Sequence, residues 1–481
     1  MELGRVPLRI VQIVAILLVA FKFVHLSFAG VFMDEAYYWM WGQHPALSYY
    51  DHPPLNAWLL GLSSAVFGWN LFALRLPVGL SFLADIFALY LISRRIGGTN
   101  WQGHFWVTLL LFVVTPIYWM ITTVALPDHL LLTACLFAIY FFFRLFQDRA
   151  SGEPGEDRDL YVGALFLGFA GLAKYNAAFL AVGLVLFIVL RDRALLRQGR
   201  LYMAAALTLA MQLPVLIWNI TEHFASMEFI LQGRHAGLAA RFDGMYPLAI
   251  GILIFVSPFL FWPIGKFAFS AKNAIPGSGF ARATFLVSTV GIVGVAFTTL
   301  VLFHWNLVAY AAMLPFLAAF MRPRWLLVLQ GLYGIVFVGF AFVNYSIMPM
   351  TDVRGWGDEA TAWSYGWSDV ATAVEAVRAA HPVSFVATAD YTTASLLAFA
   401  THDRDVVSLA ARTDEYDYWF DPKAHAGQDA ILFGDTWRPL TPDITRQFKQ
   451  ITELTTVATV VHGTEYDART IYLAQDFMPD E

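Results

Sequence analysis

Cysteine and charge are both scarce in this sequence of 481 residues. Its single cysteine, Cys135, lies in an apolar run, so no disulfide can form within the chain. Only 14% of the residues are charged and 58% are hydrophobic, whereas a soluble globular protein is about a quarter charged and about half apolar. The composition therefore excludes an ordinary soluble domain and predicts a polytopic membrane protein.

Several common functional motifs are also missing. The sequence has no glycine loop of the kind that cradles phosphate, no Ser/His/Asp motif and no Cys/His pattern with zinc spacing. It shows no internal repeat, no low-complexity segment and no basic surface interleaved with aromatic residues. We therefore expect no nucleic-acid partner. The candidate functional residues must then be the isolated polar residues of this apolar chain.

The few charges divide the chain in two. Residues 1–345 hold 21 Lys and Arg against 15 Asp and Glu, whereas residues 346–481 hold 9 against 21. The contrast predicts a membrane domain at 1–345 and an acidic soluble domain at 346–481. The predicted fold class is a mainly α, polytopic membrane protein with a small C-terminal α/β domain outside the cytoplasm.

Eleven apolar runs predict the membrane spans. They cover residues 10–31, 71–92, 105–120, 129–146, 160–173, 177–190, 201–218, 247–267, 283–303, 307–320 and 325–345. The first run is too long for a signal-peptide core and is expected to be retained. Lys and Arg concentrate in alternate loops, which predicts a cytoplasmic N-terminus. The first loop, the loop at 219–246 and the C-terminal domain are then expected on the outer side of the membrane.

The C-terminal part alternates predicted helices and strands. Residues 368–380 carry valines on one helical face. Val383–Ala387 and Ala430–Phe433 have the pattern of short buried strands, and Asp390–Ala400 that of a helix after the first of them. This alternation indicates a small α/β domain.

The first outer loop, residues 32–69, is acidic. It contains Asp34, Glu35 and Asp51 but no Lys or Arg. Ionisable groups beside a membrane are functional by default, so we expect catalytic carboxylates here. An acid that caps a helix starting after Glu35 would explain one of the three carboxylates, but not all of them.

Two prolines follow Asp51 and His52 in the same loop. They hold the backbone extended and prevent a helix from starting before Leu55. The turn either serves only as a rigid connection to the next helix, or it also orients Asp51 and His52 towards a site. A histidine is neutral or cationic near pH 7, so His52 can contact a phosphate or a metal ion.

Two cations stand in apolar surroundings. Lys174 and its neighbour Tyr175 lie between two apolar runs, on the side predicted to be outer. Lys174 either extends to the membrane surface or meets an anionic headgroup such as an isoprenoid phosphate. Arg75 lies just inside an apolar run and requires an anionic partner.

Two further residues are weaker candidates. Asp128 follows Pro127 at the predicted start of a helix, where it is either a cap or a site residue. His304 precedes Trp305 at an outer helix end. A tryptophan there is typical of a membrane-interface anchor, and His304 is a further site candidate.

Taken in order, these motifs resemble the polytopic GT-C glycosyltransferases. The likeness is to the bacterial branch related to protein O-mannosyltransferases and to the lipid A aminoarabinose transferase. It covers most of residues 30–320, and the ordered set is more specific than any single piece. The matching pieces are Asp34–Tyr38, Tyr50–Leu55, Ala73–Pro77, Pro127–Leu131, Gly171–Tyr175 and His304–Trp305.

The resemblance implies a sugar donor linked to polyprenyl phosphate and an acceptor hydroxyl on a glycolipid or a protein. It places Asp34 at the first-loop catalytic acid, with Glu35 beside it, and Asp51 at a second acidic position. It also implies a single displacement that inverts the sugar. The family includes metal-dependent and metal-independent members, and Asp34 and Asp51 are the candidate ligands of a divalent metal ion.

The donor phosphate would be bound by cations and a hydroxyl. Lys174, Arg75, His52 and Tyr175 are the candidates for this contact. His52 departs from the aminoarabinose transferases, which have a lysine before the two prolines, and a neutral histidine holds a phosphate less firmly.

Three functions follow from these observations. The first is a glycosyltransferase at the outer face of a bacterial inner membrane, embedded in the lipid bilayer. The second is a polytopic transporter or flippase of lipid or sugar, for which ionisable residues near the midplane and a two-fold repeat are expected. The third is a non-catalytic assembly protein with an acidic tail, which leaves the carboxylates of the first loop unexplained.

Overall fold

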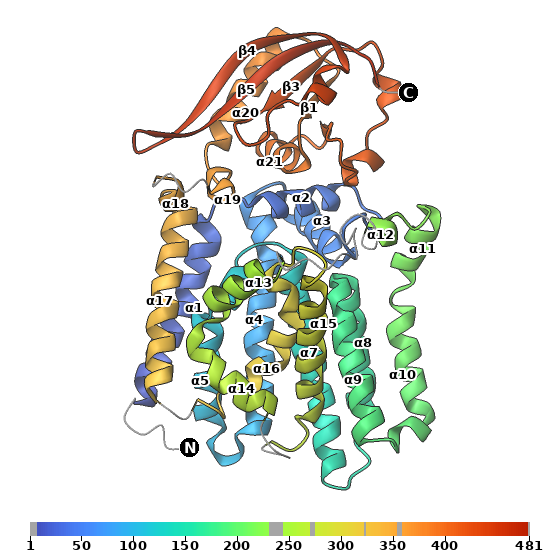
Figure 1. Cartoon of the computed structure of the whole chain (residues 1–481), viewed down its shortest axis with the longest axis vertical. Coiled ribbons are helices and arrows are strands. Elements are labelled where there is room, and N and C mark those ends of the chain that lie inside the picture. Colours follow the sequence, from blue (N-terminus) through green and yellow to red (C-terminus); the bar gives the residue numbers. More distant parts are fainter. Residues whose placement is uncertain (1–6, 230–243, 270–274, 322–323, 354–357, 480–481) are drawn as a thin grey trace. The chain divides into compact units, whose positions relative to one another are not determined.

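The computed structural model describes residues 7–229, 244–269, 275–321, 324–353 and 358–479 (Figure 1). It divides into two compact units. We term residues 1–26, 47–56 and 77–338 the helical unit, and residues 27–46, 57–76 and 339–481 the sheet unit. Both the helical character of the membrane part and the small C-terminal sheet confirm the predicted fold class.

The helical unit is built almost entirely of apolar helices. Short 3₁₀ turns, Tyr175–Ala177 (η2) and Phe303–Asn306 (η7) among them, connect some of these helices. The α-helices are α1 (Leu8–Phe28), α4 (Leu71–Ile96), α5 (Trp101–Val114), α6 (Pro116–Ile121), α7 (Pro127–Ala150), α8 (Asp157–Ala173), α9 (Ala178–Arg191), α10 (Gly199–Ala210), α11 (Leu213–Thr221), α12 (Ala225–Glu228), α13 (Met245–Gly251), α14 (Phe261–Phe269), α15 (Gly279–Ala296), α16 (Leu307–Leu317) and α17 (Arg324–Ser346).

The predicted number of eleven spans is not confirmed. Five helices of the described residues are long and apolar enough to cross a membrane, and up to seven if each of two bent pairs is one span. Several predicted spans form shorter helices, such as the 14 residues of α5 and the 11 residues of α16. A straight crossing takes about 20 residues.

One bent pair breaks sharply at Ser257. Met245–Val256 and Pro258–Phe269 meet at an angle of 80°. Ser257 has φ +80°, which a residue with a side chain rarely adopts, and the proline after it cannot donate a backbone hydrogen bond. The hydroxyl of Tyr333 donates to the carbonyl of Ile254 at 2.6 Å. This bond satisfies a backbone group near the break, as an apolar environment demands.

The core of the helical unit centres on α16. Every residue of this helix is buried, and it packs against α7 and α15. A helix that is apolar all round is expected in such an interior position. At the contact of α9 with α15, a Cβ on Gly183 would come within 2.4 Å of the Cα of Thr284. Only glycine allows these two backbones to approach so closely.

The sheet unit joins a piece of the first loop to the C-terminal α/β domain. Its helices are α2 (Met33–Gln43), α3 (Leu55–Phe67), α18 (Met350–Val353), α19 (Glu359–Ala362), α20 (Trp367–Ala380), α21 (Tyr391–Thr401) and α22 (Pro442–Thr445), with a 3₁₀ turn η8 (Glu415–Tyr418). Its strands are β1 (Phe385–Thr388), β2 (Val406–Ser408), β3 (Ala430–Gly434), β4 (Phe448–Val461) and β5 (Thr464–Phe477).

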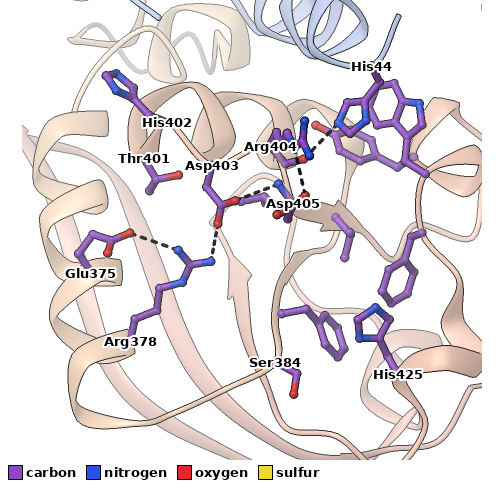
Figure 2. Close-up of a pocket in the computed structure, with 16 residues that line it drawn as sticks. His44, Glu375, Arg378, Ser384, Thr401, His402, Asp403, Arg404, Asp405 and His425 are labelled. Atoms are coloured by element: carbon purple, nitrogen blue, oxygen red, sulfur yellow. Dashed lines mark hydrogen bonds and ion pairs between the residues drawn. The ribbon is translucent and has the colours of Figure 1, made fainter. Parts of the chain in front are cut away.

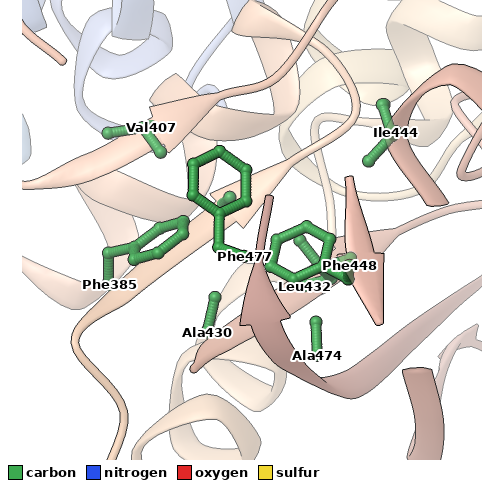
Figure 3. Packing of buried hydrophobic residues seen from close by; sticks show 9 residues of the cluster. Phe385, Val407, Ala430, Leu432, Ile444, Phe448, Ala474 and Phe477 are labelled. Atoms are coloured by element: carbon green, nitrogen blue, oxygen red, sulfur yellow. The ribbon is translucent and has the colours of Figure 1, made fainter. Parts of the chain in front are cut away.

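The five strands form one sheet in the order β2-β1-β3-β5-β4. The first three are parallel, and β5 is antiparallel to both β3 and β4. Aromatic and aliphatic side chains form the core against it (Figure 3): Phe385, Val407, Ala430, Leu432, Ile444, Phe448, Ala474 and Phe477. The predicted helix at 368–380, the helix after the first strand and both predicted strands are confirmed within two residues at each end.

Strands β4 and β5 form a long hairpin that the sequence analysis missed (Figure 1). Each strand has 14 residues, and much of β4 is exposed. His462 and Gly463 join them with φ +51° and +82°, as a two-residue turn of type I′ requires. The glycine at the turn and the β-branched residues of β4 are the signal that would have revealed the hairpin.

Candidate active site

Lys174 and Asp128 form a buried ion pair in the helical unit. Asp128 lies in the first turn of α7, and Lys174 directly follows the last residue of α8. Because α7 and α8 pack against each other, these ends meet, and Nζ of Lys174 donates to Oδ2 of Asp128 at 2.7 Å. The side chains are only 6% and 3% exposed, so Lys174 does not extend to a membrane surface. Within the described part of the chain, Oδ1 of Asp128 has no hydrogen-bond partner.

The loop with the two prolines approaches the same corner. Asp51 and His52 are both buried, and the carboxylate of Asp51 acts electrostatically on the hydroxyl of Tyr175. The amide of Asn56 donates to the carbonyl of Ala125 at 2.8 Å, which fixes the end of the turn. The turn can therefore both lead rigidly into the next helix and orient Asp51 towards a site.

A third segment joins this corner through η7. The amide of Asn176 donates to the carbonyl of Trp305 at 2.7 Å and so ties the connection between α8 and α9 to η7. The neighbouring His304 acts electrostatically on Asp128. The helical unit thus gathers Asp51, His52, Asp128, Lys174, Tyr175 and His304, which come from four separate stretches of sequence.

Glu35 and Arg75 form a second buried ion pair, in the sheet unit. Nη2 of Arg75 donates to the carboxylate of Glu35 and, at 3.0 Å, to the carbonyl of Gly30. The same oxygen of Glu35 accepts the backbone N–H of Phe32 at 2.8 Å, as the third residue of a helix does in a capping box. The side chains are 0% and 4% exposed. The anionic partner that the sequence predicts for Arg75 is therefore Glu35.

Asp34 is the second residue of α2 and is half-buried. Phe32 occupies the cap position, and Glu35 satisfies its backbone N–H. The capping role that the sequence left open for these acids therefore belongs to Glu35.

Helix α2 is held by the C-terminal part of the sheet unit, against which it packs through α21. The hydroxyl of Tyr37 accepts the backbone N–H of Glu415 at 2.9 Å, and its ring centroid is 4.6 Å from that of Tyr391. On the same helix, Ala36 packs in a buried cluster with Trp363. The first turn of α2 thus takes its position from residues more than 300 positions later in the sequence.

The other end of α2 is held by His44. Its ring stacks on that of Trp419 with 4.1 Å between centroids, and Nε2 lies 3.3 Å from the carbonyl of Arg404. Burial lowers the pKa of His44, which favours the neutral ring at pH 7. No local sequence pattern singles out His44, because its partners are remote in sequence.

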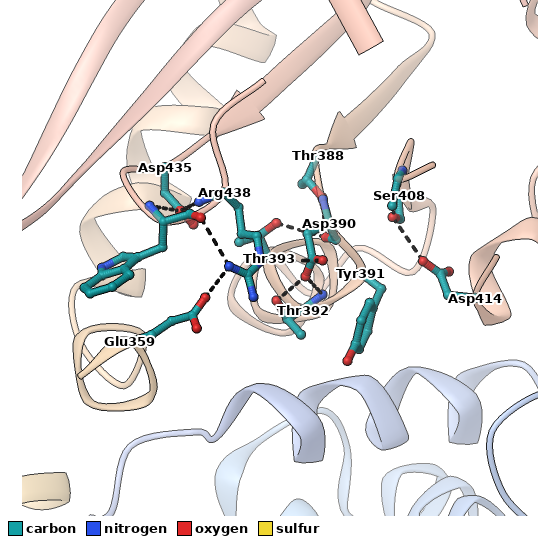
Figure 4. Close-up of polar contacts among 12 residues, drawn as sticks. Glu359, Thr388, Asp390, Tyr391, Thr392, Thr393, Ser408, Asp414, Asp435 and Arg438 are labelled. Carbon is teal, nitrogen blue, oxygen red and sulfur yellow. Dashed lines mark hydrogen bonds and ion pairs between the residues drawn. The ribbon is translucent and has the colours of Figure 1, made fainter. Parts of the chain in front are cut away.

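A polar cluster lies at the carboxyl ends of β1 and β3 (Figure 4). Asp390 follows β1 and accepts the backbone N–H of Thr392 at 2.9 Å, so it caps α21. Arg438 follows β3, lies 3.6 Å from Asp390 and also pairs with Glu359. The cluster ties α19 to the sheet. Asp435, which also follows β3, accepts backbone N–H groups of the next turn.

Burial and the nearby Asp467 raise the pKa of Asp435 to about 6. The folded state therefore keeps a proton that the unfolded chain releases near pH 4, so this stabilisation is present below about pH 4 and is lost as the pH rises through about 6. We expect Asp435→Asn to gain thermal stability relative to the wild type as the pH rises from 4 to 7. The melting temperature of both proteins, followed across this range by circular dichroism, measures the gain.

The matched control is Asp443→Asn, at an exposed carboxylate of the same domain. We expect its melting temperature to differ from the wild type by an amount that varies little with pH. A pH-independent difference for Asp435→Asn would show that folding does not raise the pKa of its carboxyl.

A buried lysine in the first apolar run escaped the sequence analysis. Lys22 is fully buried in α1, and its Nζ donates to the carbonyl of Trp119 and to the hydroxyl of Thr123, both at 2.6 Å. It lies 3.9 Å from the centre of the Trp119 ring. The indole N–H of Trp119 in turn donates to His25 at 3.0 Å. A lysine within an apolar run was the available signal.

In the described ranges, no group of three or more His, Cys, Asp or Glu side chains is placed to hold a metal ion. The two carboxylates predicted as metal ligands, Asp34 and Asp51, fall in different units. Half of the predicted outer loop at 219–246, residues 230–243, lies outside the described residues.

Comparisons with known proteins find similarity to membrane glycosyltransferases. A family model described as dolichyl-phosphate-mannose-protein mannosyltransferase matches residues 51–218, a stretch that includes Asp128 and Lys174. A lipid A galacturonosyltransferase, RgtD of Rhizobium johnstonii, is 28% identical over 193 residues. This match covers 39% of the chain and 38% of that relative, so the chain matches well under half the length of this curated relative.

Solved structures match over nearly the whole chain. ArnT from Cupriavidus metallidurans aligns with a TM-score of 0.63 at 14% identity, covering 96% of this chain and 97% of ArnT. The same values hold for ArnT bound to undecaprenyl phosphate. The oligosaccharyltransferase AglB from Archaeoglobus fulgidus aligns with a TM-score of 0.52 at 12% identity, over 88% of this chain and 69% of AglB. At these identities the likeness is one of fold.

Proposed function

We propose that this chain, which shares its fold with ArnT, is a GT-C glycosyltransferase that moves a sugar from a polyprenyl-phosphate donor to a hydroxyl of a glycolipid. The observation that carries the proposal is the match over 96% of the chain to a protein solved with undecaprenyl phosphate. The lipid A galacturonosyltransferase among its relatives supports a glycolipid rather than a protein as the acceptor.

The corner of the helical unit suits the phosphate of the donor. Lys174 supplies a buried cation, and Tyr175 and His52 add a hydroxyl and an imidazole nearby. An ammonium that already holds one carboxylate has further N–H donors for a phosphate oxygen. In this assignment Asp128 holds Lys174 in place until the donor binds.

The reaction is a single displacement. Asp34 takes the proton of the acceptor hydroxyl as its oxygen forms a bond to the anomeric carbon. The bond from that carbon to the phosphate oxygen breaks, and the electron pair leaves with polyprenyl phosphate. Lys174 and His52 stabilise the charge that develops there. No enzyme nucleophile is required, and the configuration at the anomeric carbon inverts.

Glu35 and Arg75 have a structural role, in contrast to Asp34. Each is buried and already engaged by the other, so we assign both to holding the first turn of α2. Asp51 is the second acidic residue of the site. A divalent metal ion as the source of positive charge is the alternative to stabilisation by the cations of the protein alone.

The distribution of Lys and Arg supports an orientation in the membrane. It places the N-terminus in the cytoplasm and the C-terminal domain, residues 346–481, in the periplasm of a bacterial inner membrane. The domain boundary near residue 345 follows the end of α17 at Ser346. With this orientation, donor and acceptor meet on the outer side.

A lipid or sugar transporter is the second candidate. The broken helix at Ser257 favours it, because discontinuous helices are typical of transporters. The two proposals differ in one observable. A transferase releases free polyprenyl phosphate, whereas a transporter moves its cargo across the membrane with all bonds intact.

The proposal is tested by a transfer assay in sealed, right-side-out membrane vesicles. Polyprenyl-phosphate mannose or polyprenyl-phosphate galacturonic acid is supplied outside with lipid A, with and without EDTA. We expect polyprenyl phosphate to be released and lipid A to gain the mass of one sugar, by mass spectrometry, in both conditions. Loss of transfer in EDTA that added metal restores would show that the reaction requires a divalent metal ion.

Two other outcomes contradict the proposal. Transfer only in inverted vesicles would reverse the orientation. Movement of the intact donor across the membrane, with neither sugar cleaved, would identify a transporter.

A further inference from the structure

The sheet unit contains a polar pocket of about 690 Å³ that the proposed reaction does not use (Figure 2). Pockets that bind small ligands measure about 300–1,000 Å³. This one lies at the amino ends of β1 and β2, with residues of α20, α21 and the end of α2 around it. All of its lining residues belong to one compact unit.

Aromatic rings form one side of the pocket. Trp419 is half-buried, stacks on His44 at 4.1 Å and lies edge-on to Tyr416 at 5.0 Å. The rings of Phe420 and His425, which also line the pocket, stack at 4.9 Å. Flat ring faces of this kind pack against the C–H face of a sugar ring, and their edges leave its hydroxyls accessible.

Charged groups form another part of the lining (Figure 2). Arg378 pairs with Asp403 and, at 3.4 Å, with Glu375. Arg404 and Asp405 are exposed and 3.7 Å apart. Two arginines face three carboxylates, so the pocket has no excess of positive charge for a phosphate. It offers donors and acceptors side by side, which hydroxyl groups require.

We propose that this pocket binds the saccharide of the glycolipid acceptor at a distance from the reacting hydroxyl. Helix α2 provides the spacing, since Asp34 lies at its first turn and His44 follows its last residue. Ten residues of α-helix span about 15 Å. A short oligosaccharide bridges this distance, so one part of the acceptor lies at the pocket while its hydroxyl reaches Asp34. This inference rests on the proposed function for the identity of the ligand.

The test measures binding directly, so it does not depend on catalysis. The probes are the glucosamine disaccharide of fully deacylated lipid A and the same disaccharide with inner-core sugars, titrated calorimetrically into the full chain in nanodiscs. We expect Trp419→Ala and Arg404→Ala each to weaken binding roughly tenfold, the effect of one lost contact of moderate strength.

Two substitutions are matched controls. Tyr418→Ala removes the aromatic residue next to Trp419 that does not line the pocket, and Arg446→Ala removes an exposed arginine paired with an acid elsewhere in the domain. Both should keep wild-type affinity. Arg404 is 67% exposed, so Arg404→Ala remains informative if Trp419→Ala fails to fold.

Equal affinity in all variants, or no binding of either saccharide to the wild type, would overturn the proposal. The proposed function can fail separately. The protein could bind the saccharide through Trp419 and yet transfer no sugar. That result would support the proposed binding pocket and contradict the proposed reaction.

Discussion

Asp34→Asn is expected to lower sugar transfer by a factor on the order of 10²–10⁴, the usual contribution of a positioned general base. The substitution keeps the size of the side chain but removes the carboxylate that accepts the proton. Asp34 is the second residue of α2 and does not occupy its cap position, so the fold and the binding of polyprenyl phosphate should stay close to wild type. Transfer rates at saturating donor and acceptor, beside melting temperatures, measure the effect.

The control for Asp34→Asn is Asp369→Asn. Asp369 is likewise an acid in the first turn of a helix of the sheet unit, here α20, but it is exposed. Its substitution should leave transfer unchanged. Wild-type transfer by Asp34→Asn would move the base to Glu35 or Asp51. Partial rescue of the variant by added divalent metal would point to a ligand rather than a base.

Lys174→Ala is expected to lower both the folding stability and the affinity for the donor. It leaves the carboxylate of Asp128 buried without its cation, which costs about 3–5 kcal/mol of folding stability. Adding Asp128→Asn removes the unpaired charge, so the double variant should regain most of that stability. If Lys174 holds the donor phosphate, the double variant should still bind polyprenyl phosphate at least roughly tenfold more weakly than the wild type.

Lys174→Arg keeps the charge and should bind the donor better than either variant without it. The matched control is the double variant Arg149→Ala/Asp192→Asn, which neutralises another ion pair of the helical unit away from the site. Native mass spectrometry of nanodiscs with polyprenyl phosphate gives the affinities. If Lys174→Ala/Asp128→Asn binds polyprenyl phosphate with wild-type affinity, the ion pair has only a structural role.

The sequence predicted the elements whose pattern is local. The helix α21 begins at Tyr391, after Asp390, because that aspartate caps it, and this signal lies within a few residues. Strand β3 is buried along its whole length and so appears as an unbroken apolar run. The long strand β4 has neither property, since its mostly exposed residues give no apolar run to detect.

The pairing of charges could not be predicted in the same way. The sequence showed that Arg75 needs an anion, but Glu35 is 40 residues away and only the fold brings the two together. The same holds for Lys174 and Asp128, which are 46 residues apart. Both residues of each pair were identified as candidates, yet nothing in the sequence distinguished a partner in the protein from a partner in the substrate.

The hydrogen bond between Glu415 and Tyr37 also sets an order of events during biosynthesis. The two residues are 378 positions apart, and a ribosome adds about 5–20 residues per second. Tyr37 therefore exists for about 20–75 s before the backbone that holds it has been made. During that interval the helix that bears Asp34 still lacks its support. A ribosome that stops short of Glu415 releases a membrane protein whose first loop is complete in sequence and cannot be put in place.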